Sequence, residues 1–126
     1  MKTTITVFLF IISFNLYAQQ QPGWVSIGRE IGYDFYYKQN TIVRGDNPFV
    51  IVVGIPMQTI KDALGVKVKY VSVNVLFYNS SVGMRVRISN HIYYYDDESF
   101  TKPGLPARDM PITHYALLTK LYDAIR

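Results

Sequence analysis

The feature that most limits the possible folds is a pair of long segments, residues 66–78 and 84–95, separated by a short polar connection. Apolar and polar side chains alternate along the second segment, a period of two that is typical of a strand with one buried face. The connection, Asn79-Ser-Ser-Val-Gly83, consists largely of residues that accept unusual backbone angles. We therefore predict a long antiparallel hairpin whose turn is centred near Ser81.

This centre assigns every side chain of the hairpin to one of two faces. The predicted core face places Leu76 opposite Val86, Tyr70 opposite Ile92, and Val68 opposite Tyr94. The second face is an aliphatic and aromatic floor with four cations, on which Lys67 is opposite Tyr95, Lys69 opposite Tyr93, Val75 opposite Arg87, and Phe77 opposite Arg85. Since side chains alternate strictly, a slip of one residue would mix the two sets.

The rest of the chain adds shorter strands and one helix. Strands are predicted over residues 24–29, 33–38, 41–44 and 49–55, whereas 59–64 is ambiguous and can form a helical turn. Residues 101–110 contain two prolines and a glycine and are predicted to form a loop.

The C-terminal residues 111–126 have apolar side chains at helical spacing, with Pro111 as a suitable start and Thr113 as a candidate cap. An apolar sheet face needs a cover, and this helix has the matching stripe. The predicted fold class is α+β, an antiparallel β-sheet of about five to six strands packed by one C-terminal α-helix.

The N-terminus has the pattern of an export signal. Lys2 precedes an apolar run over residues 5–14, and Ala18 offers a small residue for cleavage. The run is shorter than the roughly 20 apolar residues that span a membrane. We predict a cleaved signal peptide over 1–18, a flexible leader over 19–23, and a single domain over 24–126, with no integral membrane anchor after cleavage. The periplasm, the outer cell surface and the medium are all possible destinations.

Composition excludes several classes of function. The chain has no cysteine, which excludes disulfides, thiol catalysis, cysteine-ligated metals and a lipoprotein anchor. A formal net charge of +4 permits contact with acidic surfaces but does not indicate nucleic acid binding. No phosphate-binding loop, HExxH or GxSxG motif is present. His114 is expected at the surface, and His91 is a minor candidate for a metal or substrate contact or for a hydrolase. The main prediction is a protein without catalysis, cofactor or metal.

Short motifs resemble the bacterial surface-adhesin protein E-like family. They are Trp24 soon after the signal, Asp34-Phe-Tyr-Tyr37, Thr41-Ile-Val-Arg44, and Arg85-Val-Arg-Ile-Ser89 followed by Tyr93-Tyr-Tyr-Asp96. The resemblance implies a small sheet backed by a helix, exported by a Gram-negative bacterium, in a family whose name-giving members bind host matrix proteins. The leader also resembles those of Bacteroidetes-type bacteria. Many relatives have a disulfide that fixes the last helix, so here burial of Leu118, Leu121, Tyr122 and Ile125 must hold it.

The resulting hypothesis is an exported, adhesin-like binding module that recognises an extracellular or envelope protein through an exposed sheet face. Tyr and Arg favour interface centres, although cationic stems can also simply cover aliphatic surface. The predicted binding residues are Lys67, Lys69, Arg85, Arg87, Tyr93 and Tyr95. The alternative is a periplasmic carrier of a small apolar ligand between sheet and helix, in a cavity lined by Phe35, Val68, Tyr70 and Ile92. The sequence leaves the partner and the oligomeric state open.

Overall fold

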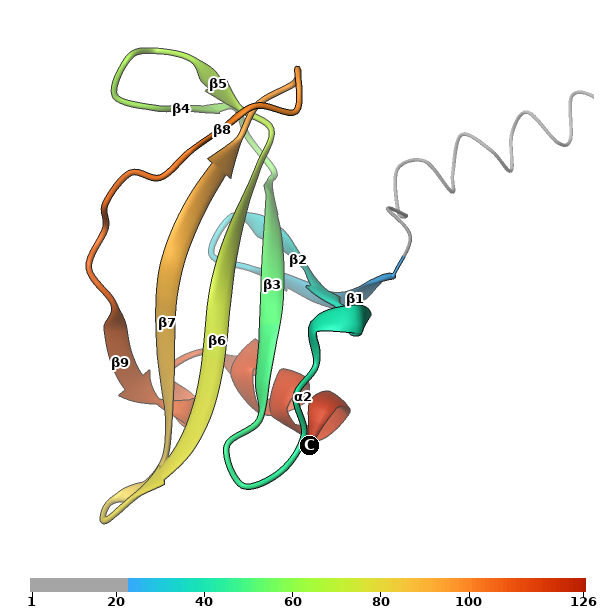
Figure 1. Ribbon diagram of the computed structural model, residues 1–126, viewed down its shortest axis with the longest axis vertical. Coiled ribbons are helices and arrows are strands. Elements are labelled where there is room, and N and C mark those ends of the chain that lie inside the picture. The colour runs from blue at the N-terminus through green and yellow to red at the C-terminus, as the bar shows by residue number, and fades with distance from the viewer. Residues whose placement is uncertain (1–22) are drawn as a thin grey trace, which may run out of the picture.

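The computed structural model describes residues 23–126, so the predicted signal peptide and nearly all of the leader lie outside the described residues. The main antiparallel sheet has the order β1-β2-β3-β6-β7-β8, with β9 also pairing with β7 (Figure 1). Its strands are β1 (Trp24–Glu30), β2 (Tyr33–Lys38), β3 (Phe49–Pro56), β6 (Tyr70–Ser80), β7 (Gly83–Tyr94), β8 (Phe100–Thr101) and β9 (Arg108–Pro111). The remaining elements are the small sheet of β4 (Ile60–Lys61) and β5 (Lys67–Val68), the 3-10 helices η1 (Gln39–Thr41) and η2 (Ile112–His114), and the helix α2 (Ala116–Ile125).

The predicted α+β class is confirmed, with seven strands in the main sheet instead of five or six. Two local predictions were wrong, those for residues 41–44 and 101–110, and one ambiguous segment is now assigned. The strand expected over 41–44 is η1 followed by a single bridge from Val43 to Phe49. The ambiguous segment 59–64 contributes β4, and the loop expected over 101–110 contains the start of β9 and the end of β8.

The long hairpin is confirmed, but its predicted register was wrong by one residue. The turn is a two-residue connection between Ser80 and Gly83, so Phe77 pairs with Val86 and Leu76 pairs with Arg87. Two-residue turns are the commonest hairpin connections, because their twist matches that of the strands. A turn centred on Ser81 alone would have contained an odd number of residues, whereas the observed turn contains two, Ser81 and Val82. As a result, Phe77 and Val75 belong to the core and Leu76 does not.

A bulge in β7 changes the side of the sheet that its last residues occupy. Ser89 pairs with Asn74, and Ile92 pairs with Ser72. Asn90 and His91 therefore both lie opposite Val73, the one residue between Ser72 and Asn74 on β6. Asn90 has φ of 55°, a left-handed conformation in which asparagine is enriched. The extra residue reverses the alternation beyond it. Side chains of β7 after the bulge therefore lie on the face opposite to that expected from the first half.

The core lies between α2 and one face of the sheet, which we call the inner face (Figure 1). Phe77 and Val86 on the hairpin are fully buried, and Leu118, Leu121 and Ile125 on α2 are also buried. The ring of Tyr122 packs on Phe77, with centroids 5.2 Å apart. These contacts involve the four helix residues that were expected to replace a disulfide.

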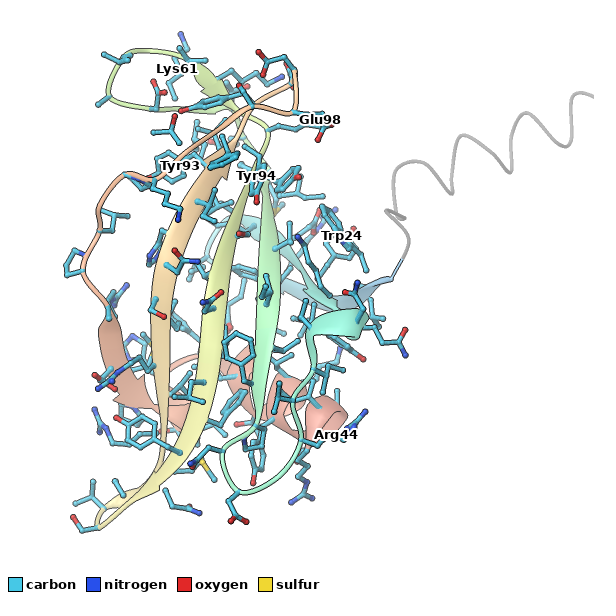
Figure 2. The ribbon with its side chains drawn as sticks, in the orientation of Figure 1. Trp24, Arg44, Lys61, Tyr93, Tyr94 and Glu98 are labelled. Carbon is cyan, nitrogen blue, oxygen red and sulfur yellow. The ribbon has the colours of Figure 1, made fainter. Side chains whose placement is uncertain are left out.

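Two polar contacts from the sheet side also fix the ends of α2. Glu30 accepts hydrogen bonds from the first two amides of the helix, those of Ala116 and Leu117, each at 3.1 Å. Arg44 donates to the carbonyl of Ile125 at the other end, at 2.7 Å (Figure 2). Both charges complement the helix dipole. The predicted cap at Thr113 was wrong, because Thr113 lies in η2 and the helix has no capping side chain of its own.

Candidate functional site

The sheet face that points away from α2, the outer face, carries a continuous row of aromatic rings. Tyr70 and Tyr94 are cross-strand partners whose rings stack with centroids 4.6 Å apart. The ring of Trp24 meets Tyr70 edge-on at 5.2 Å, and Trp24 and Tyr94 are both labelled in Figure 2. Such pairs contribute about 0.5–1.5 kcal/mol each beyond their buried area. The row begins on β1 and crosses to β7.

Two further rings extend this row at its ends. Phe100 on β8 lies 5.9 Å from Tyr94, and Tyr36 on β2 lies 6.2 Å from Trp24. We call these five residues the aromatic ladder: Trp24, Tyr36, Tyr70, Tyr94 and Phe100. Four of them are half-buried, and Phe100 is 59% exposed. No described helix covers the ladder, since α2 packs on the inner face, so the rings are accessible from solvent.

One cation borders the aromatic ladder, and two others lie farther along the same face. The ammonium group of Lys38 lies 5.9 Å from the centre of the Trp24 ring, which is within cation–π range. Arg85 and Arg87 lie further along the outer face, opposite Tyr78 and Leu76. Within residues 23–126, neither Lys38 nor Arg85 forms an ion pair.

Arg87 is already engaged within the domain. Its guanidinium group lies 3.2 Å from Asp109 on β9, and the hydroxyl of Tyr78 donates to the same carboxylate. These two donors hold the pKa of Asp109 below its usual value. Arg87 therefore fits the alternative role of covering the sheet edge, which it links to β9, whereas Arg85 forms no ion pair among the described residues.

The six residues predicted to form one binding face do not lie together, which corrects the predicted arrangement. Tyr93 pairs with Val71 and lies on the inner face because of the bulge at Asn90. Tyr95 is buried and donates to Asp62 at 2.6 Å. The other four are Lys67, exposed in β5, Lys69, paired with Glu98 at 3.3 Å, and Arg85 and Arg87 on the outer face.

The inner face contains a cavity of about 290 Å³ between the sheet and α2. Its apolar wall is formed by β2, β3, β6 and the helix. Of the four predicted lining residues, Phe35 lines this cavity. Tyr70 and Ile92 lie on the outer face instead, and Val68 is buried in the small β4–β5 sheet. A cavity between the sheet and the helix is therefore present, but three of the four residues predicted to line it lie elsewhere.

Polar groups gather at one side of this inner cavity. His91 reaches it through the bulge, and Arg108 reaches it from β9 beside Ile88. The Nδ1 atom of His91 is buried and has no hydrogen-bond partner among residues 23–126. Burial, and secondarily the positive charge of Arg108, lowers the pKa of His91. The imidazole is therefore neutral at pH 7. An unbroken alternation along residues 84–95 places His91 on the other face, so the sequence pattern did not indicate this site.

The lowered pKa of His91 predicts a pH dependence of stability. Between the folded pKa and the unfolded value of about 6.5, the unfolded chain binds more protons, so stability rises with pH. Acidification from pH 7 to 5 should therefore destabilise the protein, and His91→Gln should reduce the slope. Thermal unfolding across this range measures the effect, with exposed His114→Gln as the matched control. An unchanged slope in His91→Gln would contradict the assignment.

Comparison with known proteins identifies a shared fold. Solved structures of Haemophilus influenzae protein E match with TM-scores of 0.64 and 0.63 at 9% and 8% sequence identity. The two alignments cover 84% of this chain and 85% and 88% of those chains. At this identity the likeness shows the fold alone, so the resemblance noted in the sequence holds at the level of architecture. No protein-family model matches the sequence, and no curated protein matches it.

Within residues 23–126, two further kinds of site are absent. No helix in this part of the chain is long and apolar enough to cross a membrane. Nor do these residues contain a group of three or more His, Asp or Glu side chains arranged to hold a metal ion.

Proposed function

We propose that this chain is an exported, non-enzymatic, adhesin-like binding protein that recognises an extracellular or envelope protein through its outer face. The observation that supports this most strongly is the aromatic ladder on a sheet face without a helical cover. Tyr, Trp and Arg are the residues most enriched at the energetic centres of protein interfaces. The fold shared with protein E is compatible with such a binding role.

Charge favours a partner with an acidic surface. Lys38 and Arg85 lie on the ladder's face without an ion pair among the described residues, so a partner carboxylate can reach them without breaking an existing ion pair. Rim charges of this kind mainly accelerate association and select the partner. Among the predicted binding residues, Arg85 is the best candidate for a contact with an acidic partner, because Arg87 already forms an ion pair with Asp109.

Site-specific photo-crosslinking in cells that naturally produce the protein tests this proposal. A photoreactive side chain at Phe100, the most exposed ring of the ladder, should capture a discrete protein adduct. The same group at Thr119, exposed on α2, is the matched control and should capture none. No adduct at Phe100, or equal capture at both positions, would contradict recognition by the outer face.

A charge substitution then tests the polarity of the captured partner. Arg85→Glu should reduce the yield of the Phe100 adduct about fivefold or more, since like charges oppose docking. Arg126→Glu, exposed at the end of α2 on the other side of the sheet, changes net charge equally and should leave the yield within about twofold. An equal loss in both variants would indicate a response to net charge and would contradict a specific contact at Arg85.

A further inference from the structure

We infer that the inner cavity binds a small molecule with an apolar chain and a carboxylate head, the head held by Arg108 and His91. This inference is independent of the outer face, because the cavity lies on the other side of the sheet. The site is assembled from β7, β9, the neighbouring strands and α2. Its three supporting features are an apolar wall, a free cation, and a buried polar atom without a partner.

The wall of the cavity suits a hydrocarbon chain. Phe35, Val52, Val71, Val73 and Leu121 line it from both the sheet and the helix. The volume of about 290 Å³ lies near the lower limit of small-molecule pockets, about 300–1,000 Å³. The occupant is therefore a compact ligand such as a medium-chain acid, and burial of its chain would supply the non-specific part of the affinity.

The charge at the cavity favours an anion. Arg108 is exposed and forms no ion pair among residues 23–126, so its guanidinium group can bind a carboxylate in a bidentate manner. Glu30 also lines the cavity, but its two oxygens already accept the amides of Ala116 and Leu117. The uncommitted charge of the site is thus positive, and an amine would be repelled.

His91 supplies the second contact for the head. A buried polar atom without a hydrogen bond costs about 1–3 kcal/mol, and native proteins contain few of them. Nδ1 of His91 is such an atom among the described residues. His91 lines the cavity, and a turn of its ring that brings Nδ1 to the cavity surface would let the neutral imidazole donate an N–H to a carboxylate that Arg108 also binds. The bulge at Asn90 places the ring there.

Isothermal titration of the full-length protein with decanoate, decanol and decylamine tests the inference. Decanoate should bind with one-to-one stoichiometry and at least about tenfold more tightly than either analogue, the factor expected for a charge-assisted contact. Arg108→Gln should remove this preference, while binding of decanol changes by less than about threefold. Lys102→Gln, an exposed cation in the loop between β8 and β9, is the control and should bind decanoate normally.

The position of the ligand is tested on the unmodified protein by intermolecular NOEs. Contacts between the decanoate chain and the methyl groups of Val71 and Val73 would support the inner cavity. Contacts with the rings of Trp24 and Tyr94 instead would show adsorption to the aromatic ladder and overturn the inference. It is also overturned if decanoate fails to bind, or if Arg108→Gln leaves the preference for decanoate intact. Neither outcome depends on capture of a protein by the outer face.

Discussion

Replacing Phe77 by alanine is expected to lower the free energy of unfolding by about 3–5 kcal/mol. Phe77 has no exposed surface, lies across the hairpin from Val86, and packs on Tyr122 of α2. Its removal would therefore leave a cavity between the hairpin and the helix, and the loss of dispersion contacts adds to the loss of buried area. Urea unfolding followed by circular dichroism measures the change.

Leu76→Ala is the matched control for this substitution. Leu76 is the neighbouring residue on β6, is half-buried, and faces outward opposite Arg87. Leu76→Ala should cost about 1 kcal/mol, near the centre of the distribution for point mutations. The register predicted from a turn at Ser81 reverses the two positions and gives the larger cost to Leu76. A larger effect of Leu76→Ala would therefore contradict the observed register and support that earlier pairing.

The fold was predictable because its strongest signals are local in sequence. The alternation around Val86, the glycine at 83 and the apolar stripe from Leu118 to Ile125 each indicate a strand, a turn or a helix within a few residues. Hydrophobic pattern then requires that the helix cover a sheet face. The strands β8 and β9 escaped prediction because two and four residues beside prolines carry little periodic signal.

The ends of α2 show why longer-range contacts were not predictable. Glu30 caps a helix that starts 86 residues later in the chain, and Arg44 reaches a carbonyl 81 residues away. Nothing near either residue in sequence indicates its partner, since the contact exists only once the sheet curls beneath the helix. Sequence signals for a helix cap come from the residues next to the helix. Thr113 was the candidate cap in that region, but it lies in η2 and does not cap α2.

Ile92, Tyr93 and Tyr94 were assigned to the wrong faces for one physical reason, the reversal of alternation in β7. Apolar residues occur at Met84, Val86 and Ile88 and then resume at Ile92, so the position filled by Asn90 was missing from the apolar series. That gap was the available signal for a bulge. Taking the series as continuous placed Tyr93 beside Arg85, whereas the bulge sends Tyr93 to the inner face and Tyr94 to the aromatic ladder.

Deleting Asn90 is expected to remove the bulge and to leave both faces of the sheet unchanged. The deletion would leave His91 alone opposite Val73, so Ile92 and Tyr94 stay on the outer face and Tyr93 stays on the inner face. It should therefore cost about 1 kcal/mol, near the centre of the distribution for single mutations, and the Tyr70–Tyr94 stack should remain. A cost of about 4 kcal/mol or more would require a disrupted core and would contradict the assignment of Asn90 as the extra residue.

Two substitutions at the same position separate the bulge from the asparagine side chain. Asn90→Gly keeps the left-handed backbone accessible and should change stability by less than about 0.5 kcal/mol. Asn90→Val should cost about 1–2 kcal/mol, because a β-branched residue at positive φ is strained. Urea unfolding should therefore rank the three variants, from most to least stable, as glycine, deletion and valine. If Asn90→Val cost no more than Asn90→Gly, the left-handed backbone at this position would not be required, and a bulge at Asn90 would not determine which residues of β7 reach each face.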